Sequence, residues 1–213
     1  MRLRLAVMLV LAAAPGLLAA QSGPSRLQGR VAPAALPTID SIIAVAVAES
    51  LPTEPLVQKA LEGSAKKIPP DRLVSGVLHG LAQLREAHAL ISQAVPGQPV
   101  PEGHVVSVAA ALARGLPPPI VQRLVAMAPA EPPGPVLHAA ADLVAHHFDP
   151  DSAAGLLIDA HTKGLRGVRL LDVATAADHE LQRRGGRTHA EVLAHVRDML
   201  PNVPGPKATV ARP

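Results

Sequence analysis

The sequence contains no cysteine, tryptophan or tyrosine, and its single aromatic residue is Phe148. Without cysteine, the fold gains no disulfide support and must depend on its hydrophobic core. With one ring in the whole chain, there is no stacking platform for single-stranded nucleic acid or for sugars. The chain also lacks the Trp and Tyr anchors that many protein interfaces use. Single-stranded nucleic acids, sugars and partners bound through aromatic anchors are therefore less expected from the composition alone.

Charge gives no lead to a polyanionic partner. The chain has 20 Lys and Arg against 17 Asp and Glu, and its net charge is +3. The basic residues are scattered, and the densest pairs are Lys66-Lys67 and Arg183-Arg184. A nucleic-acid site needs a patch of such residues, so we expect no nucleic-acid partner.

Residues 1–20 have the order of a secretory signal peptide. Arg2 and Arg4 precede an apolar run, and Ala20 stands at a suitable cleavage position. We therefore expect a periplasmic or secreted protein of about 193 residues, whose net charge falls from +3 to +1 when the two arginines are removed. The alternative is an uncleaved anchor, but the interrupted apolar stretch over 5–20 is shorter than the ~20 residues that span a membrane.

The rest of the chain divides into three parts by composition. Residues 21–36 are rich in Ala, Pro, Gly and Gln and are expected to form a linker. Residues 201–213 contain four prolines and are expected to form a disordered tail. Residues 37–200 form a single helical domain in this interpretation.

Within that domain, aliphatic side chains recur every three to four residues, which is the period of an amphipathic α-helix. No segment alternates with period two, so β-structure is not expected. About nine such stripes predict an all-α fold of short antiparallel helices, because short connections make successive helices neighbours. The clearest stripes are Leu56, Val57, Ala60 and Leu61; Val74, Val77, Leu78, Leu81 and Leu84; Ile120, Val121, Leu124 and Val125; and Val136, Leu137, Ala140, Ala141 and Val144.

One turn pattern follows five of these stripes. A small or polar residue ends the helix, an apolar residue follows, and a proline usually comes next; this is the sequence signature of a helix C-terminus with a left-handed residue. Leu51 and Ile68 are 17 positions apart, Leu116 and Phe148 are 32 apart, and Phe148 and Leu165 are 17 apart, as in α-hairpin repeats. Degenerate α-hairpin repeats and a compact multi-helix bundle both fit. The five turns are Ser50-Leu51-Pro52, Lys67-Ile68-Pro69, Gly115-Leu116-Pro117, His147-Phe148-Asp149-Pro150 and Gly164-Leu165-Arg166.

Helix starts carry capping residues. Thr53 is expected to cap the helix that contains Pro55, and Asp149 to cap the helix that begins at Pro150. Thr188 and Glu191 have the spacing of a capping box.

Two stretches resemble a known group of proteins. LPTEPLVQKALEG at 51–63, followed by KKIPPDRLV at 66–74, resembles a block of uncharacterised exported bacterial proteins, and DLVAHHFDP at 142–150 resembles a second block. The group has no assigned activity. The resemblance implies export and a helical fold, and it transfers no functional residue.

The sharpest chemical hypothesis is a metal site at His138, Asp142 and His146. These residues are spaced four apart, so they lie on one side of a helix. Imidazole and carboxylate at that spacing can chelate Zn²⁺ or a similar ion. The alternative is that the stripe is only the polar face opposite a buried one.

An enzyme with an unfamiliar site is a further alternative. His88 and His161 lie in phase with apolar stripes, where a histidine can act as a catalyst. Neither stands near a serine in a nucleophile motif, and the carboxylates Glu54, Glu62 and Asp71 are better explained by helix starts and surface pairs. No Gly-rich phosphate loop is present.

The sequence therefore favours an exported, non-catalytic helical protein without a cofactor, which acts as an interaction scaffold for another envelope or extracellular protein. A periplasmic metal-binding protein and an unrecognised enzyme are the alternatives.

Overall fold

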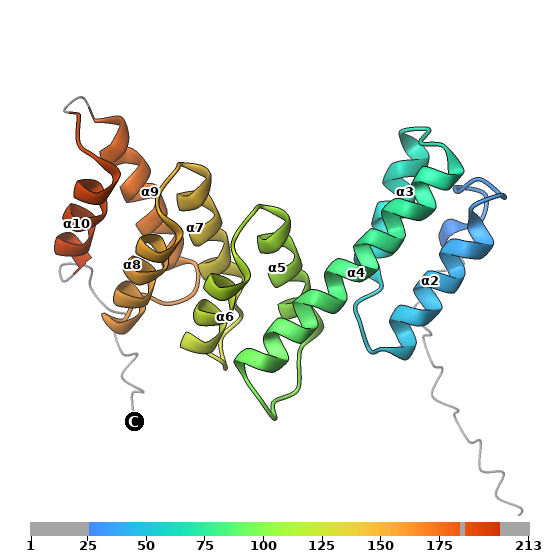
Figure 1. Ribbon diagram of the computed structural model, residues 1–213, viewed down its shortest axis with the longest axis horizontal. Helices are drawn as coiled ribbons and strands as arrows, with labels where there is room; N and C mark the ends of the chain where they lie inside the picture. The colour runs from blue at the N-terminus through green and yellow to red at the C-terminus, as the bar shows by residue number, and fades with distance from the viewer. Residues whose placement is uncertain (1–25, 184–185, 201–213) are drawn as a thin grey trace, which may run out of the picture.

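The computed structural model describes residues 26–183 and 186–200, which form nine α-helices and no strand (Figure 1). The predicted all-α fold and the predicted number of helices are confirmed. The helices are α2 (Leu36–Ala48), α3 (Glu54–Ala65), α4 (Pro70–Ala94), α5 (Glu102–Ala113), α6 (Pro118–Met127), α7 (Gly134–Ala145), α8 (Pro150–Thr162), α9 (Arg169–Gln182) and α10 (His189–Met199).

Helix starts follow local chemistry. Six of these helices have proline in the first two positions, where the missing N–H costs nothing. Asp149 caps α8, because its Oδ1 accepts from the Ser152 N–H at 2.8 Å. Thr188 and Glu191 form the predicted capping box of α10. The cap predicted at Thr53 is wrong: its side chain makes no capping bond, since its backbone is already helical rather than extended.

The five predicted helix ends are all confirmed. In each, the apolar residue's N–H donates to the carbonyl five residues back, and the preceding N–H donates to the carbonyl three residues back. These paired bonds define the Schellman motif, in which the residue before the apolar one is left-handed. The apolar residue is buried in four turns, while Ile68 remains 38% exposed. The left-handed residues are Ser50 (φ 55°), Lys67 (55°), Gly115 (86°), His147 (65°) and Gly164 (94°).

Each helix packs mainly on the helices one and two positions along the chain. The even-numbered helices from α2 to α10 form one row, and α5, α7 and α9 form a second row beside it (Figure 1). At 25 residues, α4 is about twice as long as its neighbours and contacts α2, α3, α5 and α6. The helices α3 and α5 both pack on α4 but do not pack on each other to a comparable extent.

A single cluster of buried aliphatic side chains extends through all nine helices. Phe148, the only ring of the Phe, Tyr and Trp type, is 2% exposed and packs edge-on against the His189 ring, with 4.9 Å between centroids. The protein therefore presents no such aromatic side chain on its surface.

The linker expected at 21–36 is wrong for residues 26–36. Leu27, Val31 and Ala35 are buried in the common core, and Arg26 pairs with Glu54 at 2.5 Å. The three apolar residues are spaced four apart, which is a helical face too short to stand out among the surrounding Pro and Gly. The domain therefore begins before residue 37.

Among the described residues, no helix is both long and apolar enough to cross a membrane. The expected signal peptide at 1–20 and the expected tail at 201–213 lie outside the described residues.

Candidate functional site

The polar stripe of His138, Asp142 and His146 runs along α7, where its members reach the ends of α5 and α9. The Arg114 guanidinium, at the end of α5, donates to Nδ1 of His138 at 3.1 Å and forms an ion pair with Asp142. Nε2 of His138 lies 3.3 Å from Oδ2 of Asp142. Nδ1 of the imidazole therefore accepts from Arg114, while Nε2 lies beside the Asp142 carboxylate, so both ring nitrogens face protein groups.

His146 belongs to a different pair. Its Nδ1 lies 2.6 Å from Oδ1 of Asp178 on α9. The three predicted ligands are thus divided between a network around Arg114 and a pair with Asp178. Within residues 26–183 and 186–200, no three His, Asp or Glu side chains are placed so that they could hold a metal ion. The metal hypothesis gains no support from this geometry.

Three hollows adjoin one another along the side of the molecule that carries this stripe. The first, of about 160 Å³, lies between α7 and α9. The second, of about 270 Å³, lies between α5 and α7. The third, of about 220 Å³, lies over α4 between α3 and α5. The second and third share Val106 and Ala110 as walls, and the ion pair of Arg114 with Asp142 joins the second to the first.

We call these three hollows the odd-helix groove. Its walls are mostly aliphatic, and its charged groups change along its length. The α3–α5 end carries a lysine, the middle carries an arginine, and the α7–α9 end carries two carboxylates beside a histidine. The residues that define it are Leu56, Lys59, Gly80, Leu84, Val106, Ala110, Arg114, Leu137, His138, Asp142, His146, Phe148 and Asp178.

The sequence indicated only part of this groove. His138, Asp142 and His146 stood out as a helical stripe, but nothing marked Arg114, which lies 28 residues before Asp142. Long-range ion pairs of this kind follow from helix packing and leave no local pattern. The sequence signal that could have pointed to the groove is that α5 carries further apolar residues, Val106 and Ala110, beside its buried stripe; both are exposed in the structure.

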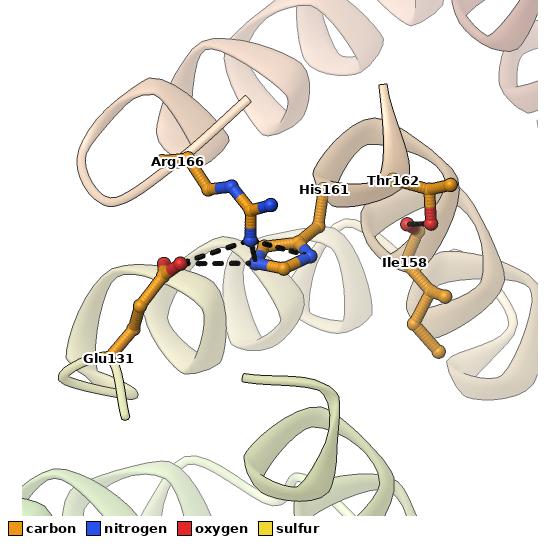
Figure 2. Close-up of polar contacts among 5 residues, drawn as sticks. All are labelled: Glu131, Ile158, His161, Thr162 and Arg166. Carbon is orange, nitrogen blue, oxygen red and sulfur yellow. Dashed lines mark hydrogen bonds and ion pairs between the residues drawn. The ribbon is translucent and has the colours of Figure 1, made fainter. Parts of the chain in front are cut away.

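His161, one of the two catalytic candidates, is 7% exposed at the end of α8. Its Nε2 lies 3.4 Å from Oε1 of Glu131, which precedes α7, and Arg166 from the α8–α9 loop contacts both the ring and that carboxylate (Figure 2). The nearest hydroxyl drawn, that of Thr162, donates to the carbonyl of Ile158 at 2.9 Å, on the side away from the ring. The cluster fastens two loops to α8, and no nucleophile in it faces the imidazole.

The other candidates are dispersed. His88 is half-buried on α4. Glu54 pairs with Arg26, and Glu62 pairs with Lys66, each at 2.5 Å. In each pair the hydrogen bond from the basic side chain lowers the pKa of the glutamate carboxyl. No two of the three predicted carboxylates form a catalytic pair.

Glu180 was missed by the sequence analysis. It is 7% exposed on α9 and lies 2.8 Å from Arg183, 3.0 Å from Arg187 and 3.8 Å from His195 of α10. The hydrogen bond from Arg183 lowers the pKa of its carboxyl. This cluster fastens the last helix pair together.

The chain matches no protein-family model, and no curated protein or solved structure is similar to it. No residue role carries over from another protein. The resemblance to uncharacterised exported proteins stays a prediction, and the odd-helix groove is the strongest lead to function.

Proposed function

We propose that this protein is an exported, non-catalytic helical scaffold that binds another envelope or extracellular protein along the odd-helix groove. The observation that carries the proposal is the run of three adjoining hollows along one side of the helix array. Elongated grooves between packed helices are a common means of holding a peptide or a partner helix.

The packing of each helix on its near neighbours supports degenerate α-hairpin repeats as the basis of this scaffold. In such arrays, each unit contacts only the units beside it, and one row of helices lines a continuous surface. In the α5–α7–α9 row, α7 packs on both α5 and α9, which is consistent with this proposal.

The aromatic content limits how such a scaffold can bind. Interfaces obtain much of their affinity from large anchors that insert into pockets of the partner. Because Phe148 is buried and the chain has no Trp or Tyr, any aromatic anchors of the interface come from the partner. This protein then supplies the pockets, and the hollows of the groove are the sites for those anchors.

The state of the histidines supports a non-catalytic role. His138 uses both ring nitrogens in its contacts with Arg114 and Asp142, and His161 is enclosed by Glu131 and Arg166. A general base needs a substrate proton within reach, and these rings are occupied by structural partners.

The test is site-specific photo-crosslinking in the protein's own host cell. A benzoylphenylalanine at Ala110, in the groove, should give one discrete adduct, while the same residue at the exposed Ala194 on α10 should give none. Absence of an adduct at Ala110, or the same adducts at both positions, would overturn the scaffold proposal. N-terminal sequencing of the protein from the envelope fraction should begin at Gln21, and full-length protein in the cytoplasm would overturn export.

A further inference from the structure

The third hollow of the groove, which we call the α3–α5 hollow, differs from the other two in its construction. The first and second hollows lie between helices that pack on each other, α7 with α9 and α5 with α7. The α3–α5 hollow lies between two helices that are held apart and joined mainly through α4 (Figure 1). The helix α3 precedes the α5–α7–α9 row, and the step from α3 to α5 is the one at which successive odd-numbered helices of the described chain do not pack closely on each other.

The floor of this hollow is formed by Gly80 and Leu84 of α4, both buried, with Leu56 and Lys59 of α3 packed on them. A Cβ added at Gly80 of α4 would lie 3.2 Å from Leu56 Cδ2 and 3.5 Å from Lys59 Cδ, so these side chains rest directly on the α4 backbone. The α5 wall consists of Val106 and of alanines, among them Ala113. Small residues let a helix backbone approach closely, as helix packing requires.

The charge of this hollow is one-sided. Lys59 is the only charged residue among those that line it. The Lys59 amine makes no hydrogen bond or close ion pair with another residue that the structure describes, and its one recorded electrostatic partner is Glu62, three residues along α3. A carboxylate seated at this rim would therefore find a cation that no hydrogen bond engages, beside an apolar surface.

From these observations, and resting on the proposed function, we infer that the α3–α5 hollow seats one amphipathic helix of the partner protein. The apolar stripe of that helix fills the space between Leu56 and Val106, and an acidic residue at its edge pairs with Lys59. The other two hollows, with their own charged groups, receive further side chains of the same partner.

The test uses a phage-displayed library of amphipathic helical peptides, with Leu, Ile, Phe or Trp on one face and Glu or Lys in equal proportion at the flanking positions. The target is the complete processed chain. Peptides enriched on the wild type should carry Glu at a flanking position. On Lys59→Glu, the same library should enrich Lys at that position. The matched control is Arg72→Glu, an equal change of charge at an exposed position on the neighbouring α4 that does not line the hollow, and it should keep the wild-type preference.

The strength of the preference follows from the exposure of the pair. An exposed ion pair contributes about 0.2–1 kcal/mol, so a leading Glu peptide should bind the wild type about 1.4- to fivefold more tightly than its Lys counterpart, and the order should reverse on Lys59→Glu. Titration calorimetry of the two peptides against the two proteins measures the four affinities that this comparison needs.

Three results would overturn the inference: no enrichment above the unselected library, equal enrichment of Glu and Lys, or self-association of the chain that Lys59→Glu abolishes. The last would identify a second copy as the occupant. A discrete adduct at Ala110 together with any of these results would refute the helix assignment and leave the scaffold proposal standing. Failure of both experiments would refute both.

Discussion

Two left-handed helix ends offer a direct test of the local rules that build this fold. Ser50 and Lys67 both have φ of 55° without being glycine, while Gly115 and Gly164 occupy the same position in equivalent turns. Left-handed geometry costs an L-residue roughly 1–2 kcal/mol. Glycine avoids that cost but loses about 0.5–1 kcal/mol more conformational freedom on folding.

The difference between these two free energies sets the size and the sign of the stability change expected from each substitution. Ser50→Gly and Lys67→Gly should each stabilise the protein by about 0.5–1 kcal/mol. Gly115→Ala and Gly164→Ala should each destabilise it by a similar amount. A Cβ at either glycine meets nothing within 4 Å, so steric overlap adds nothing and the backbone conformation accounts for the whole effect.

Thermal unfolding of the processed chain is the assay. For a chain of this length, 1 kcal/mol shifts Tm by about 2–4 °C, so each change should move Tm by about 1–4 °C in the stated direction. Lys66→Gly is the matched control, because Lys66 has φ of −77° and the same substitution one residue away should lower Tm. If Lys67→Gly and Lys66→Gly changed Tm with the same sign, the reasoning from left-handed geometry would be refuted.

Three further predictions concern stability. Asp149→Ala should lower the free energy of unfolding by about 1 kcal/mol because it removes the α8 cap, whereas Thr53→Ala should change it by only a few tenths because Thr53 makes no capping bond; equal losses in urea titrations would contradict this. Phe148→Ala should cost about 3–5 kcal/mol, and a loss below 1 kcal/mol would show that the ring is not part of the core. The pKa of Glu180 is lowered by Arg183, so the ionised carboxyl adds stability above the usual glutamate pKa, and this is lost as pH falls through the lowered value. Glu180→Gln should therefore lose less stability than the wild type on acidification, and parallel pH curves of the urea midpoint would contradict this.

What the sequence predicted well was local. A Schellman turn is formed within six residues, so the pairs Gly115-Leu116 and His147-Phe148 determine it without help from the rest of the chain. The same holds for the Asp149 cap, where an extended backbone (φ −60°, ψ 128°) lets the carboxylate reach the Ser152 N–H. Thr53 failed as a cap because its backbone (φ −90°, ψ −25°) is already turned into the helix.

What the sequence could not predict depends on how the helices come together. The stripe on α7 was visible, but its partners Arg114 and Asp178 come from other helices, and their contacts are set by the packing of α5 and α9 on α7. The α3–α5 hollow has the same origin. The sequence indicated a helical stripe from Val74 to Leu84, yet only the packed structure shows that α3 and α5 occupy separate stretches of α4 and leave a space between them.

That space has a mechanical consequence. The main contacts that join α2 and α3 to the later helices all pass through α4, since α2 and α3 pack on α4 and α4 packs on α5 and α6. A helix seated in the α3–α5 hollow would touch α3 on one side and α5 on the other, and so add a second connection between the two parts. Binding there would stabilise the folded chain, because a ligand that binds only the native state raises the free energy of unfolding, and this rise grows with the logarithm of the ligand concentration once that exceeds Kd. The gap in the row is thus the place where one bound helix would contribute most to holding the array together.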